Sequence, residues 1–430
     1  MRALVGLLHR CAGLATAAFL AVAGLTGSVI AFYHELDEWL NPELFRAAHS
    51  GAALSPLALS ERIEREHPEL FVTWLPLEVE TGHSVEMGVA PRIDAASGRP
   101  HTLGYDQIFV DPASGAVLGA RQWGACCLER RNLLPFLYTV HYSLHMPGNW
   151  GIWLMGIVGL VWIIDCFLGF YLTLPARARA KSEDEEETMH PNGSTGRGFW
   201  QRWRSAWRLK RNAGAARLNF DLHRAGGLWF WGLLLMLAVS SVSFNLHEQV
   251  FEPVVNAISP LTPTPFDARE ERAPGDLLEP GVPLATVLGN AEREARRRGW
   301  TEAASGIFYN PLYGLHGVRF GADHAPGLGN SWLYFDGQSG EPLGGHVPGE
   351  GSAGDVFHQL QYPLHSGQIL GLPGRIVICI TGLAVAMLSV TGVVIWARKR
   401  RALRRRDARA LAGRGGAPQT AIKLSADNAS

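Results

Sequence analysis

The sequence predicts an α-helical membrane protein: a four-helix transmembrane bundle built from two parallel repeats, with two extracytoplasmic α+β domains. Three observations support this fold class. Four apolar segments are long enough to cross a bilayer, the chain repeats its motifs in two halves, and basic residues gather beside the same ends of these segments. Of the 430 residues, 47% are hydrophobic and 18% are charged, which suits spanning helices combined with water-exposed domains.

The four predicted spans are long runs of apolar residues. A helix needs about 20 such residues to cross the hydrocarbon core of a bilayer. The runs lie at 11–33, 150–174, 228–246 and 376–396. With their more polar ends included, the predicted transmembrane helices cover residues 1–34, 139–175, 218–248 and 361–398.

Lysine and arginine residues indicate which side of the membrane each segment faces. They cluster before the first span, in the loop at 176–217 and in the tail at 399–430. Because such residues flank spans on the cytoplasmic side, both termini are predicted to be cytoplasmic. Residues 35–138 and 249–360 then form two domains on the outer side, which is the periplasm if the cell is Gram-negative.

Part of the loop and the whole tail are predicted to be disordered. The loop at 176–217 carries an acidic run at 183–187 beside glycine and serine, which is typical of a disordered linker, and the tail at 399–430 is predicted to be disordered as well. The formal net charge of the chain is zero, so its overall charge gives no reason to expect nucleic-acid binding.

The two halves of the chain share motifs in the same order. The segment around His9 matches the segment around His223, and each opens a span. Glycines of the second and fourth spans align at one constant offset. A parallel repeat of this kind has its pseudo-axis along the membrane normal, so equivalent residues lie at the same depth.

The predicted outer domains also repeat. Asp111 and Asp336 each begin a D-x-x-x-G turn between two runs of strand-forming residues, which is typical of a β-hairpin. Each hairpin follows a helix-like stretch, at 55–66 in the first half and 284–298 in the second. The pattern predicts the same small α+β module twice.

Four histidines occupy matched positions of the repeat. His9 and His223 fall near the cytoplasmic face, and His141 and His365 fall near the outer face. A haem b iron within a helical bundle takes two axial imidazoles from different helices at one level. The two pairs therefore predict two b haems with these residues as iron ligands, and no side chain is singled out as catalytic. Covalent c-type attachment is excluded, because no C-x-x-C-H motif occurs.

Several assignments stay open on the sequence alone. His145 is four residues from His141 and would share its helical face, so either residue could be the ligand. Histidines at the ends of spans can also lie simply in the headgroup layer, bonded to lipid or water. Three arginines are further cofactor-binding candidates, as partners of haem propionates. They are Arg10, Arg224 and Arg375.

Several motifs spread over residues 4 to 400 occur together in a known family. They are Leu8-His9-Arg10, Gly24-Leu25-Thr26-Gly27-Ser28, Asp221-Leu222-His223-Arg224, Ser243-Phe244-Asn245 and Pro363-Leu364-His365-Ser366-Gly367. In this combination the chain resembles the PepSY-associated transmembrane helix family. That family includes iron-regulated inner-membrane proteins similar to ferric-siderophore reductases.

The resemblance implies a transmembrane haem-dependent ferric (siderophore) reductase in the bacterial cytoplasmic (inner) membrane, with a role in iron homeostasis. Two b haems in a four-helix bundle would carry electrons from the cytoplasmic side to a ferric siderophore beside the periplasmic PepSY-like domains, and Fe(II) would be released. The electron donor, cytoplasmic or in the membrane, is not supplied by this chain. The alternative is a non-redox, membrane-anchored binding or regulatory protein that acts through its PepSY-like domains.

Overall fold

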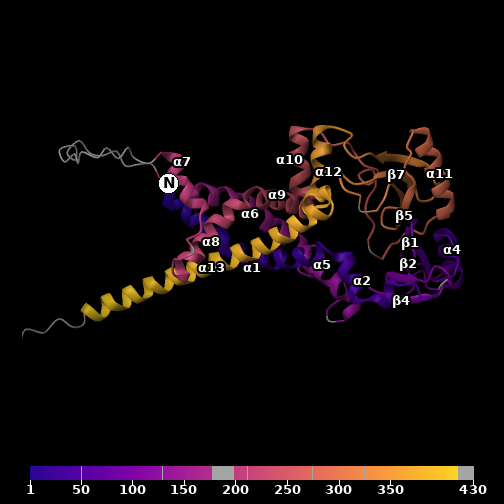
Figure 1. Cartoon of the computed structure of the whole chain (residues 1–430). Helices are drawn as coiled ribbons and strands as arrows, with labels where there is room; N and C mark the ends of the chain where they lie inside the picture. The colour runs from indigo at the N-terminus through magenta and orange to yellow at the C-terminus, as the bar shows by residue number, and fades with distance from the viewer. Residues whose placement is uncertain are drawn as a thin grey trace, which may run out of the picture. The chain divides into compact units, whose positions relative to one another are not determined.

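A computed structural model describes residues 1–49, 51–127, 129–176, 198–210, 212–273, 275–323 and 325–414 (Figure 1). Contacts within the chain divide it into two compact units. One unit comprises residues 1–18, 167–229 and 387–430, and the other comprises 19–166 and 230–386. The acidic run at 183–187 and residues 415–430 of the predicted tail lie outside the described residues.

Three helices are long and apolar enough to span a membrane. They are α1 (Arg2–Ile30), α6 (Trp150–Thr173) and α13 (Leu372–Arg414). The remaining predicted span is a pair of helices, α8 (Ala215–Trp229) and α9 (Trp231–Asn245), bent by 69° at the break between them. The described part of the chain therefore has three candidate spans, or four if the bent pair is one span, and these helices bring the protein into contact with lipid.

The second, third and fourth predicted transmembrane helices are each divided in two, so the prediction of continuous helices at 139–175, 218–248 and 361–398 is wrong. α5 (Leu133–Ser143) carries His141 and ends because Leu144 and His145 both have a left-handed φ of 54°. α12 (Ala353–Ser366) carries His365 and ends at Gly367, which is also left-handed. A short helix, η5 (Gln368–Leu370), then leads to α13.

The C-terminal tail differs from its prediction in its first part. α13 continues through residues 399–414, which the sequence predicts as disordered. This stretch is rich in alanine, leucine and arginine, and all three favour helix. The helix therefore extends well past the apolar run that would cross the membrane.

The β domain is built on one antiparallel sheet of eight strands in the order β4-β3-β2-β1-β5-β6-β7-β8. The strands are β1 (Leu70–Pro76), β2 (Val85–Pro91), β3 (Gln107–Val110), β4 (Val117–Arg121), β5 (Ala304–Asn310), β6 (Leu315–Phe320), β7 (Ser331–Asp336) and β8 (Pro342–His346). α4 (Pro56–Glu66) and α11 (Leu284–Arg297) bury their apolar faces in the same core as the strands (Figure 1).

Short helices connect these parts. They are α2 (Tyr33–Leu40), α3 (Pro42–Phe45), η1 (Arg130–Asn132), α7 (Phe199–Trp203), η3 (Arg204–Trp207), the π-helix η4 (His247–Phe251) and α10 (Glu252–Ile258).

The two predicted hairpins are present and have the same turn. Asp111 follows β3, and its Oδ1 accepts hydrogen bonds from the backbone of the second and third residues that follow it. Asp336, at the end of β7, makes the same two bonds. Gly115 and Gly340 each adopt a φ of 72°, a conformation that glycine tolerates without steric cost. The sequence prediction of a repeated D-x-x-x-G hairpin is confirmed.

The two halves of the β domain meet at β1 and β5. These strands are equivalent in the repeat, and they pair directly, with Trp74 opposite Phe308 and Pro76 opposite Gly306. The indole of Trp74 lies over Gly306: a Cβ there would be 2.6 Å from Cη2. The guanidinium of Arg319 lies 5.3 Å from the same ring. The four strands of each half therefore belong to one continuous sheet, a pairing that the sequence did not indicate.

We predict that Gly306→Val weakens this junction. The new side chain would overlap the indole of Trp74, and β5 cannot retreat without losing its ladder with β1. We expect a loss of about 1–3 kcal/mol in local stability, measured as faster hydrogen exchange of the β1 and β5 amides. The control is Gly289→Ala on α11, where a new methyl group would lie 3.6 Å from Arg293. Unchanged protection in Gly306→Val would contradict the tight contact.

Candidate functional site

The structure brings together both histidine pairs that the repeat predicts. His141 on α5 and His365 on α12 have ring centroids 6.0 Å apart and ring planes at 71°. His9 on α1 and His223 on α8 have centroids 6.2 Å apart and planes at 53°. In each pair the two residues come from different halves of the chain.

The spacing of both pairs suits a metal between two imidazoles. A ring nitrogen binds a metal at about 2 Å, so two imidazoles on opposite sides of one metal have centroids about 6 Å apart. Among the described residues, no group of three or more His, Cys, Asp or Glu side chains is arranged to hold a metal ion. A site with only two histidines fits a metal that brings its own equatorial ligands, as haem iron does.

Hydrogen bonds to the backbone fix the tautomer of one ring in each pair. Nδ1 of His141 lies 3.0 Å from the carbonyl oxygen of Ala23, and Nδ1 of His223 lies 3.1 Å from that of Leu388. A carbonyl oxygen can only accept, so Nδ1 carries the proton in both rings. In the neutral ring Nε2 then keeps its lone pair, and this is the arrangement of a metal-binding histidine.

In three of the four rings, Nδ1 also bonds the hydroxyl oxygen of a threonine or serine. Each hydroxyl donates to a backbone carbonyl one turn earlier in its own helix, so its oxygen accepts from the imidazole. The distances from hydroxyl oxygen to Nδ1 are 3.1 Å for Thr26 and His141, 3.1 Å for Thr391 and His223, and 2.7 Å for Ser240 and His365. Sequence reasoning missed these three residues as site residues.

Glycines give the rings room. A Cβ on Gly27 would lie 2.9 Å from Cε1 of His141, and one on Gly392 would lie 3.1 Å from Cε1 of His223. The signal was present in the sequence, because Gly27 and Gly392 each follow one of the threonines that hold these rings. Gly159 instead packs against α9, as expected for a helix contact.

A cavity of about 610 Å³ lies beside the pair at His141 and His365. Its wall is mostly apolar, with Trp162 and Val385 among the lining residues, and both histidines border it. This volume is typical of a site for a cofactor or a drug-sized ligand. The ring of His141, whose Nε2 keeps its lone pair, therefore borders a cavity of a size that suits a cofactor.

His145 does not join this pair. Because α5 ends at Ser143, His145 no longer shares a helical face with His141. Its Nε2 lies 3.0 Å from the carbonyl oxygen of Gly124, and its ring packs on Phe136 with centroids 5.0 Å apart. Of the two candidates that the sequence left open, it is His141 that lies opposite His365.

The three candidate arginines have different surroundings. Arg375 borders the cavity, where its Nη2 pairs with Glu35 at 2.7 Å and its Nε donates to a backbone carbonyl. Arg224 is held by Asp221 at 2.8 Å and by the carbonyl oxygen of Ser205. Arg10 is exposed on α1. Of the three, Arg375 is the one that the structure places at the wall of the cavity.

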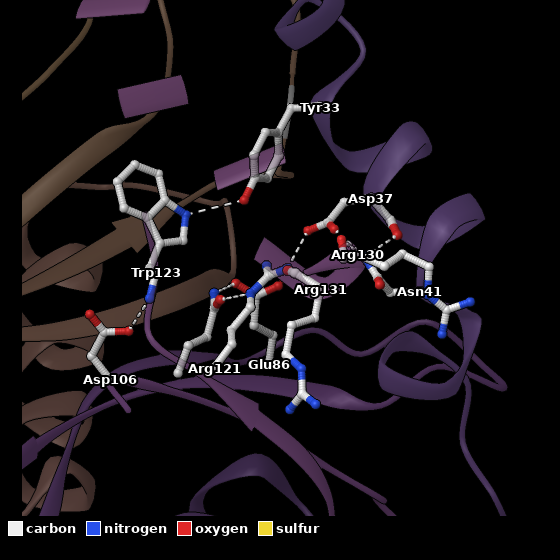
Figure 2. Close-up of polar contacts among 10 residues, drawn as sticks. Tyr33, Asp37, Asn41, Glu86, Asp106, Arg121, Trp123, Arg130 and Arg131 are labelled. Atoms are coloured by element: carbon white, nitrogen blue, oxygen red, sulfur yellow. Dashed lines mark hydrogen bonds and ion pairs between the residues drawn. The ribbon is translucent and has the colours of Figure 1, made fainter. Parts of the chain in front are cut away.

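A buried polar network joins the end of the α1 region to the β domain (Figure 2). Asp37 on α2 and Arg121 on β4 form a fully buried ion pair with a distance of 2.8 Å between Oδ2 and Nη1. Nearby, the hydroxyl of Tyr33 accepts from Nε1 of Trp123 at 3.1 Å. Tyr33 also lines the cavity, so this network positions one of its walls.

Glu86 on β2 belongs to the same network. Gln107 donates a hydrogen bond to Glu86 and accepts one from Arg121. Burial, partly offset by the positive charge of Arg121, raises the pKa of Glu86 to about 7. The charge of this carboxyl group therefore changes near neutral pH.

These features define an α-helical membrane protein with a β domain and two histidine pairs among its helices. The chain belongs to the family described as the PepSY-associated TM region, whose model matches residues 7–399. The resemblance proposed from the sequence motifs is confirmed. No curated protein matches the chain.

The raised pKa of Glu86 predicts a pH dependence of stability. From its ordinary pKa of 4.5 up to about 7, the folded state binds more protons than the unfolded state, so stability falls as the pH rises through this range and then levels off. Hydrogen exchange of the β2 and β3 amides between about pH 5 and about pH 8 measures this, after correction for intrinsic exchange rates. Glu86→Gln should flatten the profile, and Glu61→Gln, at an exposed position on α4, should not. A flat profile in the parent protein would contradict the raised pKa.

Proposed function

We propose that this protein is a transmembrane oxidoreductase that holds two b haems and reduces a ferric siderophore. In this proposal the two parallel repeats form a four-helix bundle in the cytoplasmic (inner) membrane, with both termini in the cytoplasm. The β domain, as two PepSY-like modules, is periplasmic. Electrons come from an unidentified cytoplasmic or membrane donor, and the Fe(III) of the siderophore is reduced to Fe(II), which is released.

One observation carries the proposal: within each of the two histidine pairs, the rings have the spacing of two axial ligands of one metal. His9 and His223 would hold one haem, and His141 and His365 the other. Bound haem would supply reversible one-electron chemistry to the protein. Family membership supports the membrane part of the proposal, because the matched family is described as a PepSY-associated TM region. The link to ferric-siderophore reductases rests on the resemblance of the sequence motifs.

The chain's own groups orient the ligands and shape the site. The carbonyl oxygens of Ala23 and Leu388 hold Nδ1–H and so present Nε2, which also raises the basicity of the ring. The mostly apolar lining of the cavity beside His141 and His365 suits the macrocycle of a haem. Arg375 at the cavity wall is suited to a carboxylate, because it already binds that of Glu35 at 2.7 Å.

The direct test is the haem content of the purified protein. A haemochrome assay with protein quantification should give two haems per chain, and the dithionite-reduced spectrum should show b-type bands. A colourless protein that still folds would overturn the proposal. It would favour the alternative of a non-redox binding or regulatory protein.

Ligand variants should separate the two pairs. We expect His365→Ala to lose one haem of two and His223→Ala to lose the other, because each removes one axial imidazole from a different pair. His145→Ala is the matched control, as it lies beside His141 in sequence but outside the pair, and it should keep both haems. Loss of haem in His145→Ala with retention in His141→Ala would assign the ligand to His145 instead of His141.

The hydroxyl supports give a finer test. Thr391→Val removes the hydroxyl at Nδ1 of His223 but leaves the Leu388 carbonyl oxygen. Loss of such a partner lowers metal affinity by about 10- to 100-fold, so transfer of haem to an excess of a haem-scavenging apoprotein should be faster. Thr16→Val is the control, since Thr16 is buried on α1 and its hydroxyl bonds the Ala12 carbonyl. Equal transfer from both variants would contradict the role given to Thr391.

A further inference from the structure

A third pair of histidines lies apart from the two pairs described above. His247 opens the π-helix η4 directly after α9, and His358 is on α12. Their ring centroids are 4.8 Å apart and their planes are tilted by 34°. A single-turn π-helix is rare and occurs frequently at functional sites.

The spacing of this pair differs from that of the other two in a way that has chemical meaning. Two imidazoles on opposite sides of a metal have centroids about 6 Å apart, whereas two on adjacent coordination positions have centroids about 4.5 to 5 Å apart. The value of 4.8 Å therefore suits two neighbouring ligands of one small ion and leaves no space for a flat macrocycle between the rings.

The rings are held in place, but their nitrogens are unused. Phe251 packs on both, with centroids 5.7 Å from His247 and 5.8 Å from His358. Within the part of the chain that the structure describes, the ring nitrogens of these two histidines have no hydrogen-bond partner. The protein covers part of the His358 side chain, but the rest is exposed, so an ion can reach the pair from water.

Several charged and titratable groups surround His358. Burial lowers the pKa of His358, and the neighbouring imidazoles of His247 and His346 lower it further. The carboxylates of Asp355 and Asp267 act in the opposite direction, since their negative charge attracts any cation.

The pair is also close to the proposed outer haem site along the same helix. His358 precedes His365 by seven residues of α12, which is two turns on one helical face, or about 10 Å. α9, which precedes His247, supplies Ser240, the hydroxyl partner of His365. An ion released beside His141 and His365 would therefore be close to His247 and His358.

We propose that His247 and His358 form a binding site for a divalent transition-metal ion, which receives the Fe(II) released after reduction. The identity of the ion as released Fe(II) rests on the proposed function, whereas the ion site itself does not. Imidazole suits Fe(II), while the hard oxygen donors of many chelators favour Fe(III). With two protein ligands and water in the other positions, the site binds an ion weakly enough to pass it on.

The site is tested by metal binding to the purified full-length protein. Ni²⁺ and Zn²⁺ are the probes, because they bind imidazole more tightly than Fe(II) does and are not oxidised. Equilibrium dialysis followed by elemental analysis should show one ion per chain at this site, in addition to any ions bound elsewhere on the protein. His247→Ala and His358→Ala should each weaken this binding by more than about tenfold. His101→Ala, at an exposed position in the β domain, should not change it.

The two proposals can fail separately. Unchanged Ni²⁺ and Zn²⁺ binding in both His247→Ala and His358→Ala would overturn the ion site, whatever the haem content. Haem content and the reduced spectrum should be the same in these variants as in the parent, which also shows that the helices are folded. Loss of haem in either variant would mean that the pair supports the helices instead, and would count against the ion site.

Discussion

The hydrogen bond from an imidazole Nδ1–H to a backbone carbonyl oxygen is the interaction on which the site depends. A free histidine side chain has two tautomers and can rotate, so two of them seldom present their lone pairs to one point. The carbonyls of Ala23 and Leu388 remove this freedom for His141 and His223. A helix carbonyl one turn from a threonine is a rigid acceptor, and the following glycine lets the ring approach it closely.

The repeat applies this interaction in both halves of the chain. In the first half His141 is held by α1, and in the second half His223 is held by α13. Each of these rings then meets a histidine from the other half. The same exchange occurs in the β domain, where β1 of one half pairs with β5 of the other. Both histidine pairs and the sheet therefore need residues from the two halves of the chain together.

Apolar runs and repeated motifs predicted the spans, the turns at Asp111 and Asp336, and the two histidine pairs, because these features are local or follow from symmetry. The sequence did not reveal the β1–β5 junction, since any apolar strand edge could have paired there. It also missed the breaks in the second, third and fourth predicted helices. The left-handed residues Leu144 and His145 are not glycine, so only Pro147 and Gly148 hinted that α5 ends. That break removes His145 from the helical face of His141.

The central claim is that four imidazoles bind metal in two opposed pairs. The most direct measurement is the visible spectrum of the dithionite-reduced protein before and after addition of carbon monoxide. Haem iron with two imidazole ligands has no open position, so the account predicts b-type bands that carbon monoxide leaves unchanged. A shift of the bands on addition of carbon monoxide would show an open position at the iron, and absence of haem bands would remove the metal altogether. Either result would contradict the account.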